Sequence, residues 1–252
     1  MFYRNGGIRL KLEEMTWEEV KKAAEKNTPM IIPSGGLASF GLHLPLGTNV
    51  MIVYELALKV AEETKVMVAP PIWFGYEYPT ENFVEVTLWP NHFKEYVYWV
   101  VRSFVNKGFK KFILFYGALH NISSLNYCAQ KIVEKFPNTK VAVVAWWQLV
   151  KKTLMELFPE ERGHRAESSE TSLMMVLRPK LVKKDKIKDE VPEIVLFYDL
   201  YPRPPQCSTS SGVYGKPSLA SEEKGEKLVK EIVDKMKRMI ENELVLESDF
   251  YK

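Results

Sequence analysis

The hydrophobic positions of this chain form short apolar runs that alternate with longer stretches in which apolar residues recur at helical spacing. A run such as Met30–Pro33 is too short for a helix, whereas Val50–Thr64 carries apolar residues three and four positions apart. This pattern predicts strands at 30–33, 66–71, 111–116, 140–147 and 193–200. It predicts helices at 17–26, 50–64, 92–107, 123–136, 169–177 and 222–244.

Polar residues and glycines mark the ends of several of these helices. Thr16 and Glu19 have the spacing of a capping box at the start of the first helix. Asn91 and Ser221 are the expected N-caps of two later helices, because their side chains accept hydrogen bonds from backbone N–H groups. Gly108 is expected just beyond a helix C-terminus, where a left-handed conformation is common.

The alternation of strands and helices predicts one α/β domain over residues 1–252. The expected architecture is a three-layer α/β/α sandwich with a mostly parallel sheet. The carboxyl ends of parallel strands meet at one edge of the sheet, and ligands bind there. Loops 34–49, 72–91 and 116–121 are therefore expected to converge on one candidate site.

Composition and charge narrow the class of protein. The chain is 46% hydrophobic and 27% charged, which is typical of a folded globular protein, and its net charge of +3 gives no reason to expect a nucleic-acid partner. No apolar run approaches the ~20 residues that span a bilayer, so no membrane partner is expected. Cys128 and Cys207 lack metal-type spacing, and we expect a reducing, cytoplasmic compartment. Abundant lysine and glutamate with only three glutamines favour a thermophilic source.

Six segments, collinear along the chain, carry a resemblance to the creatininase (creatinine amidohydrolase) family. HLPLGTN (43–49) resembles the family's H-L-P-L-x-T-D, and SSETSLMMVLRPKLV (168–182) resembles its E-T-S-x-x-L-x-x-x-P. The other four segments are MTWEEV, VMVAPPIWFGY, GFKKFILFYGALHN and SGVYGKPSLASEEKG. The resemblance implies an α/β sandwich, commonly assembled as a hexamer. It also implies two divalent metals, zinc or manganese, that activate water against a cyclic amide or related C–N bond.

The residues at the family's metal-binding positions differ from the family pattern. In the first loop, the metal-binding Glu, His and Asp correspond to Ala38, Phe40 and Asn49. In the third loop, the metal-binding His corresponds to Ala118, and the family's Glu two residues later corresponds to His120.

Other positions of the pattern are partly kept. The usual His of the long loop falls on Thr80, and the catalytic His falls on Arg165, with His164 one position earlier. The family's second His of the first loop remains as His43, and the Glu of E-T-S remains as Glu170.

These departures predict that the standard two-metal site is lost. Alanine and phenylalanine cannot bind metal, and asparagine offers only a neutral oxygen. Two divalent ions would leave about four positive charges largely uncompensated, which is prohibitive for a buried site. We therefore expect no cofactor, with a divalent zinc or manganese ion as the alternative.

The remaining ionisable groups are the candidates for chemistry. His120 is the best candidate for a general acid or base, because it is an imidazole at a former ligand position. Glu170 and Arg165 are the other catalytic candidates. Glu170 is expected chiefly to brace its helix, and Arg165 to pair with Glu170 or Glu167 or to bind an anionic substrate. The residues expected to line a ligand pocket are Phe40, His43, Asn49, Ala118, Asn121 and Trp146.

The sequence supports two main hypotheses about function. The leading hypothesis is an amidohydrolase-like homologue without the standard activity, which binds a small polar molecule or serves a structural role as a homo-oligomer. The alternative is an active hydrolase of a cyclic amide or formamide C–N bond, metal-free or using one metal held by His43, His120 and Glu170. A third possibility is a mixed oligomer with an active relative.

Overall fold

The computed structural model describes residues 11–78, 83–161, 165–196, 200, 202 and 204–245. The strands form one parallel sheet in the order β2-β1-β3-β4. They are β1 (Met30–Ser34), β2 (Met67–Val68), β3 (Lys111–Tyr116) and β4 (Lys140–Ala145). The α-helices are α1 (Trp17–Glu25), α2 (Thr48–Glu63), α3 (Pro90–Val105), α4 (Ile122–Lys135), α5 (Trp146–Leu149), α6 (Lys151–Leu157), α7 (Ser168–Leu177) and α8 (Glu222–Met239). Short 3₁₀ turns are η1 (Leu12–Glu14), η2 (Leu119–Asn121), η3 (Pro179–Leu181), η4 (Lys184–Lys186), η5 (Pro205–Cys207) and η6 (Pro217–Leu219), and a π-helical turn, η7 (Ile240–Val245), follows α8.

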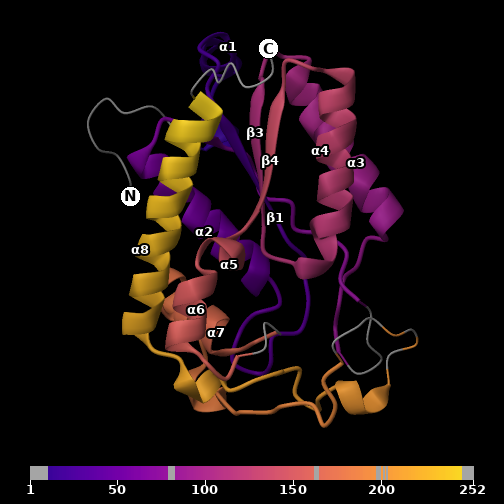
Figure 1. Ribbon diagram of the computed structural model, residues 1–252, viewed down its shortest axis with the longest axis vertical. Helices are drawn as coiled ribbons and strands as arrows, with labels where there is room; N and C mark the ends of the chain where they lie inside the picture. Colours follow the sequence, from indigo (N-terminus) through magenta and orange to yellow (C-terminus); the bar gives the residue numbers. More distant parts are fainter. Residues whose placement is uncertain are drawn as a thin grey trace.

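Helices cover both faces of the sheet, as Figure 1 shows, which confirms the predicted α/β sandwich. Successive strand residues point to opposite faces. Ile31 and Ile113 pack into the cluster that contains residues of α2, α7 and α8. Ile32 and Leu114 pack into the second cluster, with residues of α3 and α4. The strands are therefore apolar on both sides, as expected for a parallel sheet covered by helices.

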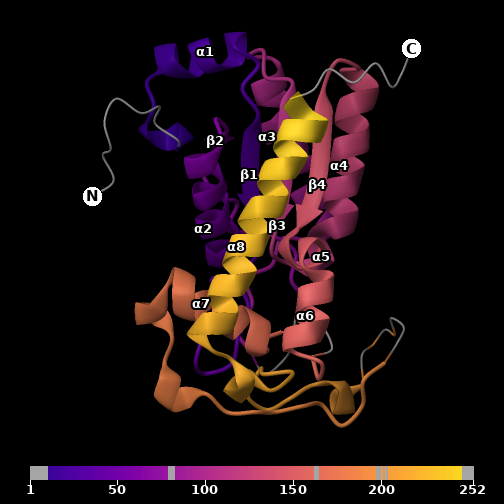
Figure 2. The same ribbon diagram turned by 60° about the vertical axis from the view of Figure 1, so that its left-hand side comes forward.

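The last helix crosses one face of the sheet with α7 at its lower end (Figure 2). The Ser221 side chain accepts a hydrogen bond from the Lys224 N–H, so Ser221 is the N-cap that the sequence predicts. Gly225 lies against α7, and a Cβ on this residue would stand 2.2 Å from the Ser172 carbonyl oxygen. The glycine therefore sets how closely α7 and α8 approach.

Several expected boundaries are corrected by the structure. Helix α3 begins at Pro90 with Trp89 as N-cap, so Asn91 lies inside the helix. Proline suits the first helical position because it lacks an N–H that would be unsatisfied there. Trp146 and Trp147 belong to α5 rather than to the preceding strand. The capping box of Thr16 and Glu19 is confirmed.

The expected late strand at 193–200 is wrong over the residues that the structure describes. Residues 193–196 have no strand pairing, and Ile194 and Val195 are each 44% exposed. An apolar run becomes a strand only when a neighbouring strand pairs with it. The strand expected at 66–71 pairs in sheet geometry only at Met67–Val68. No helix among the described residues combines the length and the apolar character that a membrane crossing requires.

Candidate functional site

The three loops predicted to converge do meet at the carboxyl-end edge of the sheet, around the carboxylate of Glu77. Glu77 is buried, at 2% exposure, and comes from the loop after β2. Asn49, the second residue of α2, donates from Nδ2 to Glu77 Oε1 at 2.8 Å. The Oδ1 atom of Asn49 accepts the Gly36 N–H at 3.0 Å. Both ends of the Asn49 amide are thus engaged by neighbouring loops.

Gly36 leaves the space that the Glu77 carboxylate occupies. A Cβ on Gly36 would stand 2.6 Å from Glu77 Oε1, which is closer than real contacts allow. Glycine therefore suits position 36 of the first loop, because the missing side chain lets the backbone approach a buried carboxylate.

The guanidinium of Arg165 bridges two buried carboxylates. Its Nη2 donates to Glu77 Oε2 at 3.0 Å and its Nη1 to Glu85 Oε1 at 3.3 Å. The side chains of Glu77 and Glu85 are 3% and 2% exposed, and that of Arg165 is 18% exposed. The guanidinium also lies over the ring of Phe40, 5.8 Å from its centroid. Ala166 next to it has a left-handed backbone (φ 59°), a conformation that costs energy and is often found at functional sites.

His120 forms the half-exposed side of this cluster. It lies on η2, with Nδ1 3.7 Å from Glu77 Oε2 and its side chain 38% exposed. Its ring meets that of Tyr76 edge-on at 6.0 Å between centroids, and Tyr76 stacks on Trp89 at 6.1 Å. The imidazole therefore stands beside a buried carboxylate and remains within reach of solvent.

Asn121 joins the same loops through its side-chain amide. Its Oδ1 accepts the Tyr76 N–H at 2.8 Å, and its Nδ2 donates to the Gly35 carbonyl at 3.0 Å. The residue is fully buried. Its position suits the bracing of the loops, because both ends of the amide already have protein partners.

The residues at the former metal-binding positions do not fit a two-metal site. Ala38, Phe40 and Ala118 are buried and supply no donor atom. The Asn49 oxygen is bonded to a backbone N–H, and the cationic Arg165 lies against the one nearby carboxylate that Asn49 contacts. Within the described ranges, no group of three or more His, Cys, Asp or Glu side chains has a metal-binding arrangement. Thr80 and His164 lie outside those ranges.

His43 is a fully buried residue that links two of the segments resembling the family. Its Nε2 lies 3.0 Å from Thr171 Oγ1, and this hydroxyl donates its own proton to the Glu167 carbonyl at 2.8 Å. Nε2 is therefore the protonated nitrogen, since Thr171 has only lone pairs left to offer. Nδ1 is buried and has no hydrogen-bond partner among the described residues. Burial lowers the pKa of His43 to about 4, so the ring is neutral.

Glu170 braces the start of α7, as the sequence suggests. Its Oε2 accepts the Ala166 N–H at 2.6 Å. Burial, together with the negative charge of Glu167, raises the pKa of Glu170 to about 8. Arg165, which the sequence pairs with Glu167 or Glu170, forms its ion pairs with Glu77 and Glu85 instead.

Trp146 directly follows the carboxyl end of β4 and is buried, at 3% exposure, in the same hydrophobic cluster as Ala38 and Phe40. Its ring meets that of Trp147 edge-on at 5.7 Å, and Trp147 in turn packs on Tyr116 at 5.4 Å. Tyr116, Trp146 and Trp147 therefore form one aromatic cluster at the carboxyl ends of β3 and β4.

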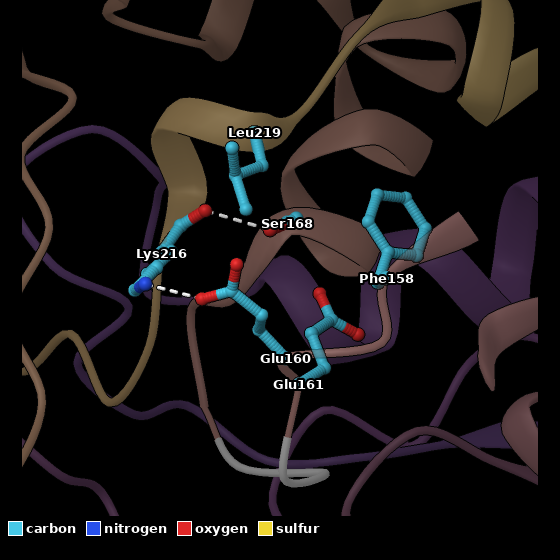
Figure 3. A pocket seen from close by; sticks show the side chains of 6 residues that line it. All are labelled: Phe158, Glu160, Glu161, Ser168, Lys216 and Leu219. Atoms are coloured by element: carbon cyan, nitrogen blue, oxygen red, sulfur yellow. Dashed lines mark hydrogen bonds and ion pairs between the residues drawn. The ribbon is translucent and has the colours of Figure 1, made fainter. Parts of the chain in front are cut away.

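A small pocket opens elsewhere, beside the N-terminus of α7 (Figure 3). Lys216 forms an ion pair with Glu160, and the Ser168 hydroxyl donates to the Lys216 carbonyl at 2.6 Å. Glu161 accepts the Ser169 N–H, and burial raises its pKa. The polar groups around this pocket are bonded to one another, which suits a structural role.

Sequence reasoning did not nominate Glu77 or Glu85, which supply the charge of the cluster. Both lie in the long loop, 72–91, that the topology of the sheet predicts at the site edge. A carboxylate in such a loop, opposite an unexpected arginine at the catalytic-histidine position, is the signal that would have identified them.

Comparison with known proteins identifies the family. The family model for creatinine amidohydrolase, Creatininase, matches residues 13–240. A creatinine amidohydrolase of Pseudomonas putida is 25% identical over 235 residues, covering 84% of this chain and 89% of that protein. A 3-dehydro-scyllo-inosose hydrolase of Thermotoga maritima is 25% identical over 263 residues, covering 90% and 81%.

Solved structures agree with this match. A creatinine amidohydrolase (creatininase) crystal structure superimposes with a TM-score of 0.85 at 22% identity, covering 94% of this chain and 98% of that one. A manganese form of creatininase superimposes with a TM-score of 0.85 at 24% identity, covering 94% and 99%. A zinc–zinc form gives 0.84 at 24% identity with the same coverage. The fold is that of an amidohydrolase of the creatininase type. The chain belongs to the creatininase family.

Proposed function

We propose that this protein is a creatininase-family homologue that has lost the two-metal hydrolase site and binds a small polar molecule at the edge where its loops meet. One observation carries the proposal. A guanidinium, that of Arg165, lies between the buried carboxylates of Glu77 and Glu85, beside the positions of Asn49 and His120 where the family pattern has metal ligands. The positive charge of the Arg165 guanidinium would repel a divalent metal ion bound at these positions.

The test combines elemental analysis with activity assays. The protein is purified without chelator and without metal-affinity resin, and zinc and manganese are measured by plasma mass spectrometry. We expect far less than one ion per chain and no turnover of creatinine, formamides or small lactams. About one or two tightly bound ions per chain, as structural or catalytic zinc sites hold, would contradict the proposal.

A metal-free hydrolase is the second candidate, and the position of His120 favours it. A half-exposed imidazole next to the buried Glu77 carboxylate is an arrangement that can orient a general base towards a substrate. Turnover of any of these amides by chelator-treated protein would support this candidate, provided that His120→Gln abolishes it. Turnover that survives in His120→Gln would count against it.

A further inference from the structure

The cluster where the three loops meet contains two carboxylates, as a cation-binding site does. The cation beside them is a side chain of the protein itself. Glu77 and Glu85 each carry a negative charge, and their side chains are 3% and 2% exposed. Carboxylates with so little contact with water are stable in the ionised form only when a cation or hydrogen-bond donors neutralise them. The guanidinium of Arg165 donates to both.

Arg165 differs from an ordinary surface ion pair in this protein. The pair between Arg178 and Glu55 joins side chains that are 46% and 21% exposed, and such pairs contribute little to stability because water screens them. The Arg165 pairs are shielded on one side by the ring of Phe40. The planar fork of a guanidinium also contacts two carboxylates at once, which an ammonium does not do as well.

The position of the cluster matches the part of the fold where the family pattern places metal ligands. Asn49 and His120 correspond to two of those ligands, and both approach Glu77. A third position, that of the catalytic histidine, is Arg165 itself. The Glu77 carboxylate and the Arg165 guanidinium, which the family pattern does not contain, thus lie together in this part of the fold.

We propose that the Arg165 guanidinium is the resident cation of this site and takes the place that metal ions have in the family's metal-binding relatives. Arg165 is a positioning residue: it holds the Glu77 and Glu85 carboxylates together and so fixes the loop that ends at α3. The inference deepens the proposed function, on which it rests for the absence of metal.

A double-mutant cycle tests the charge role directly. Thermal unfolding is measured in the presence of chelator for the wild type, Arg165→Met, Glu77→Gln and the double variant. We expect Arg165→Met to lower Tm by about 10 °C, because it leaves buried carboxylates without their guanidinium. Adding Glu77→Gln should restore part of that loss, because glutamine keeps the bond from Asn49 and removes one buried charge.

Two further comparisons separate the effect of the Arg165 charge from the effect of its packing. Arg165→Lys keeps the positive charge and should retain more of the wild-type Tm than Arg165→Met. Methylguanidinium at millimolar concentration should raise the Tm of Arg165→Met and leave that of the wild type unchanged. Arg178→Met is the matched control at an exposed pair, and we expect it to shift Tm by less than about 3 °C.

The outcomes are distinct from those of the metal analysis. An Arg165→Met variant as stable as the wild type, or a double variant whose loss is the sum of the two single losses, overturns the resident-cation proposal. If Arg165→Met does not fold, a folded double variant still supports the proposal, and an unfolded one overturns it. Because the cycle is run with chelator present, metal found in the untreated protein bears on the proposed function and leaves the cycle interpretable.

Discussion

Single residues in the segments that resemble the family have structural roles within the fold. His43 and Thr171 lie far apart in the sequence and meet in the core, where the His43 Nε2–H donates to the Thr171 hydroxyl. Gly36 makes room for the Glu77 carboxylate. These residues have partners within the protein, so packing and hydrogen bonds between side chains and backbone contribute to the form of this loop.

The burial of His43 predicts a defined pH dependence of stability. The pKa of this imidazole is about 4 in the fold and 6.5 in an unperturbed histidine, so the unfolded chain binds the proton more readily. The free energy of unfolding should therefore fall as pH drops from 6.5 to 4, by up to about 3 kcal/mol from this group. Above pH 6.5 the contribution is fully present.

Urea unfolding of His43→Gln at several pH values checks this expectation. Glutamine cannot titrate, so the variant should be less stable at pH 7 and should show a shallower decline between pH 6.5 and 4. The exposed His92, changed to Gln, serves as the control and should keep the wild-type slope. A slope for His43→Gln equal to that of the wild type would refute the assignment.

At the scale of elements, the junction of α7 and α8 depends on small groups. The Ser172 hydroxyl accepts the Ser221 N–H at 3.1 Å, at the N-cap of α8, and donates to the Ser168 carbonyl at 2.7 Å. Gly225 lies where the two helices approach each other. The segment that resembles the family around residues 211–225 therefore serves helix packing.

Gly225→Ala should destabilise the protein although alanine is the better helix former. Its Cβ would meet the Ser172 carbonyl oxygen at 2.2 Å, and backbone cannot move aside cheaply. We expect a loss of roughly 2–3 kcal/mol against a propensity gain of about 1 kcal/mol. Glu226→Ala, exposed on the same helix, is the control and should change stability by less than about 0.5 kcal/mol. Chemical denaturation of the two variants measures whether the steric clash outweighs the gain in helix propensity.

At the scale of the whole molecule, the surface of one chain carries several exposed aromatic side chains. Trp89 and Trp99 are 58% and 54% exposed, and Phe74 is 53% exposed. Exposed apolar surface of this kind is frequent at the interfaces of oligomers.

We expect the protein to form a homo-oligomer in solution, with a hexamer as the state that the family resemblance implies. Multi-angle light scattering on a size-exclusion column measures the mass at micromolar concentration and at several salt concentrations. An assembly held by apolar contacts should persist at high salt. A monomer mass under all of these conditions would contradict the expectation.

The sequence by itself determined the layered architecture, the edge where the loops meet and the residue types at the positions that correspond to the family pattern. Apolar periodicity reports which side chains must be buried, and parallel strands place their carboxyl ends together wherever the loops then lead. The side chains of Ala38, Phe40 and Ala118 have no metal-binding atom in any conformation, so this property follows from residue type alone.

Only the tertiary structure decided which charged groups lie together where the loops meet. Glu77, Glu85 and Arg165 are separated in the chain by up to 88 positions, and no local pattern predicts that their charges meet. The apolar run at 193–196 likewise has strand composition but pairs with no strand in the described part of the chain. Pairing of charges and of strands depends on long-range neighbours, and these neighbours are specified by the fold rather than by any short stretch of sequence.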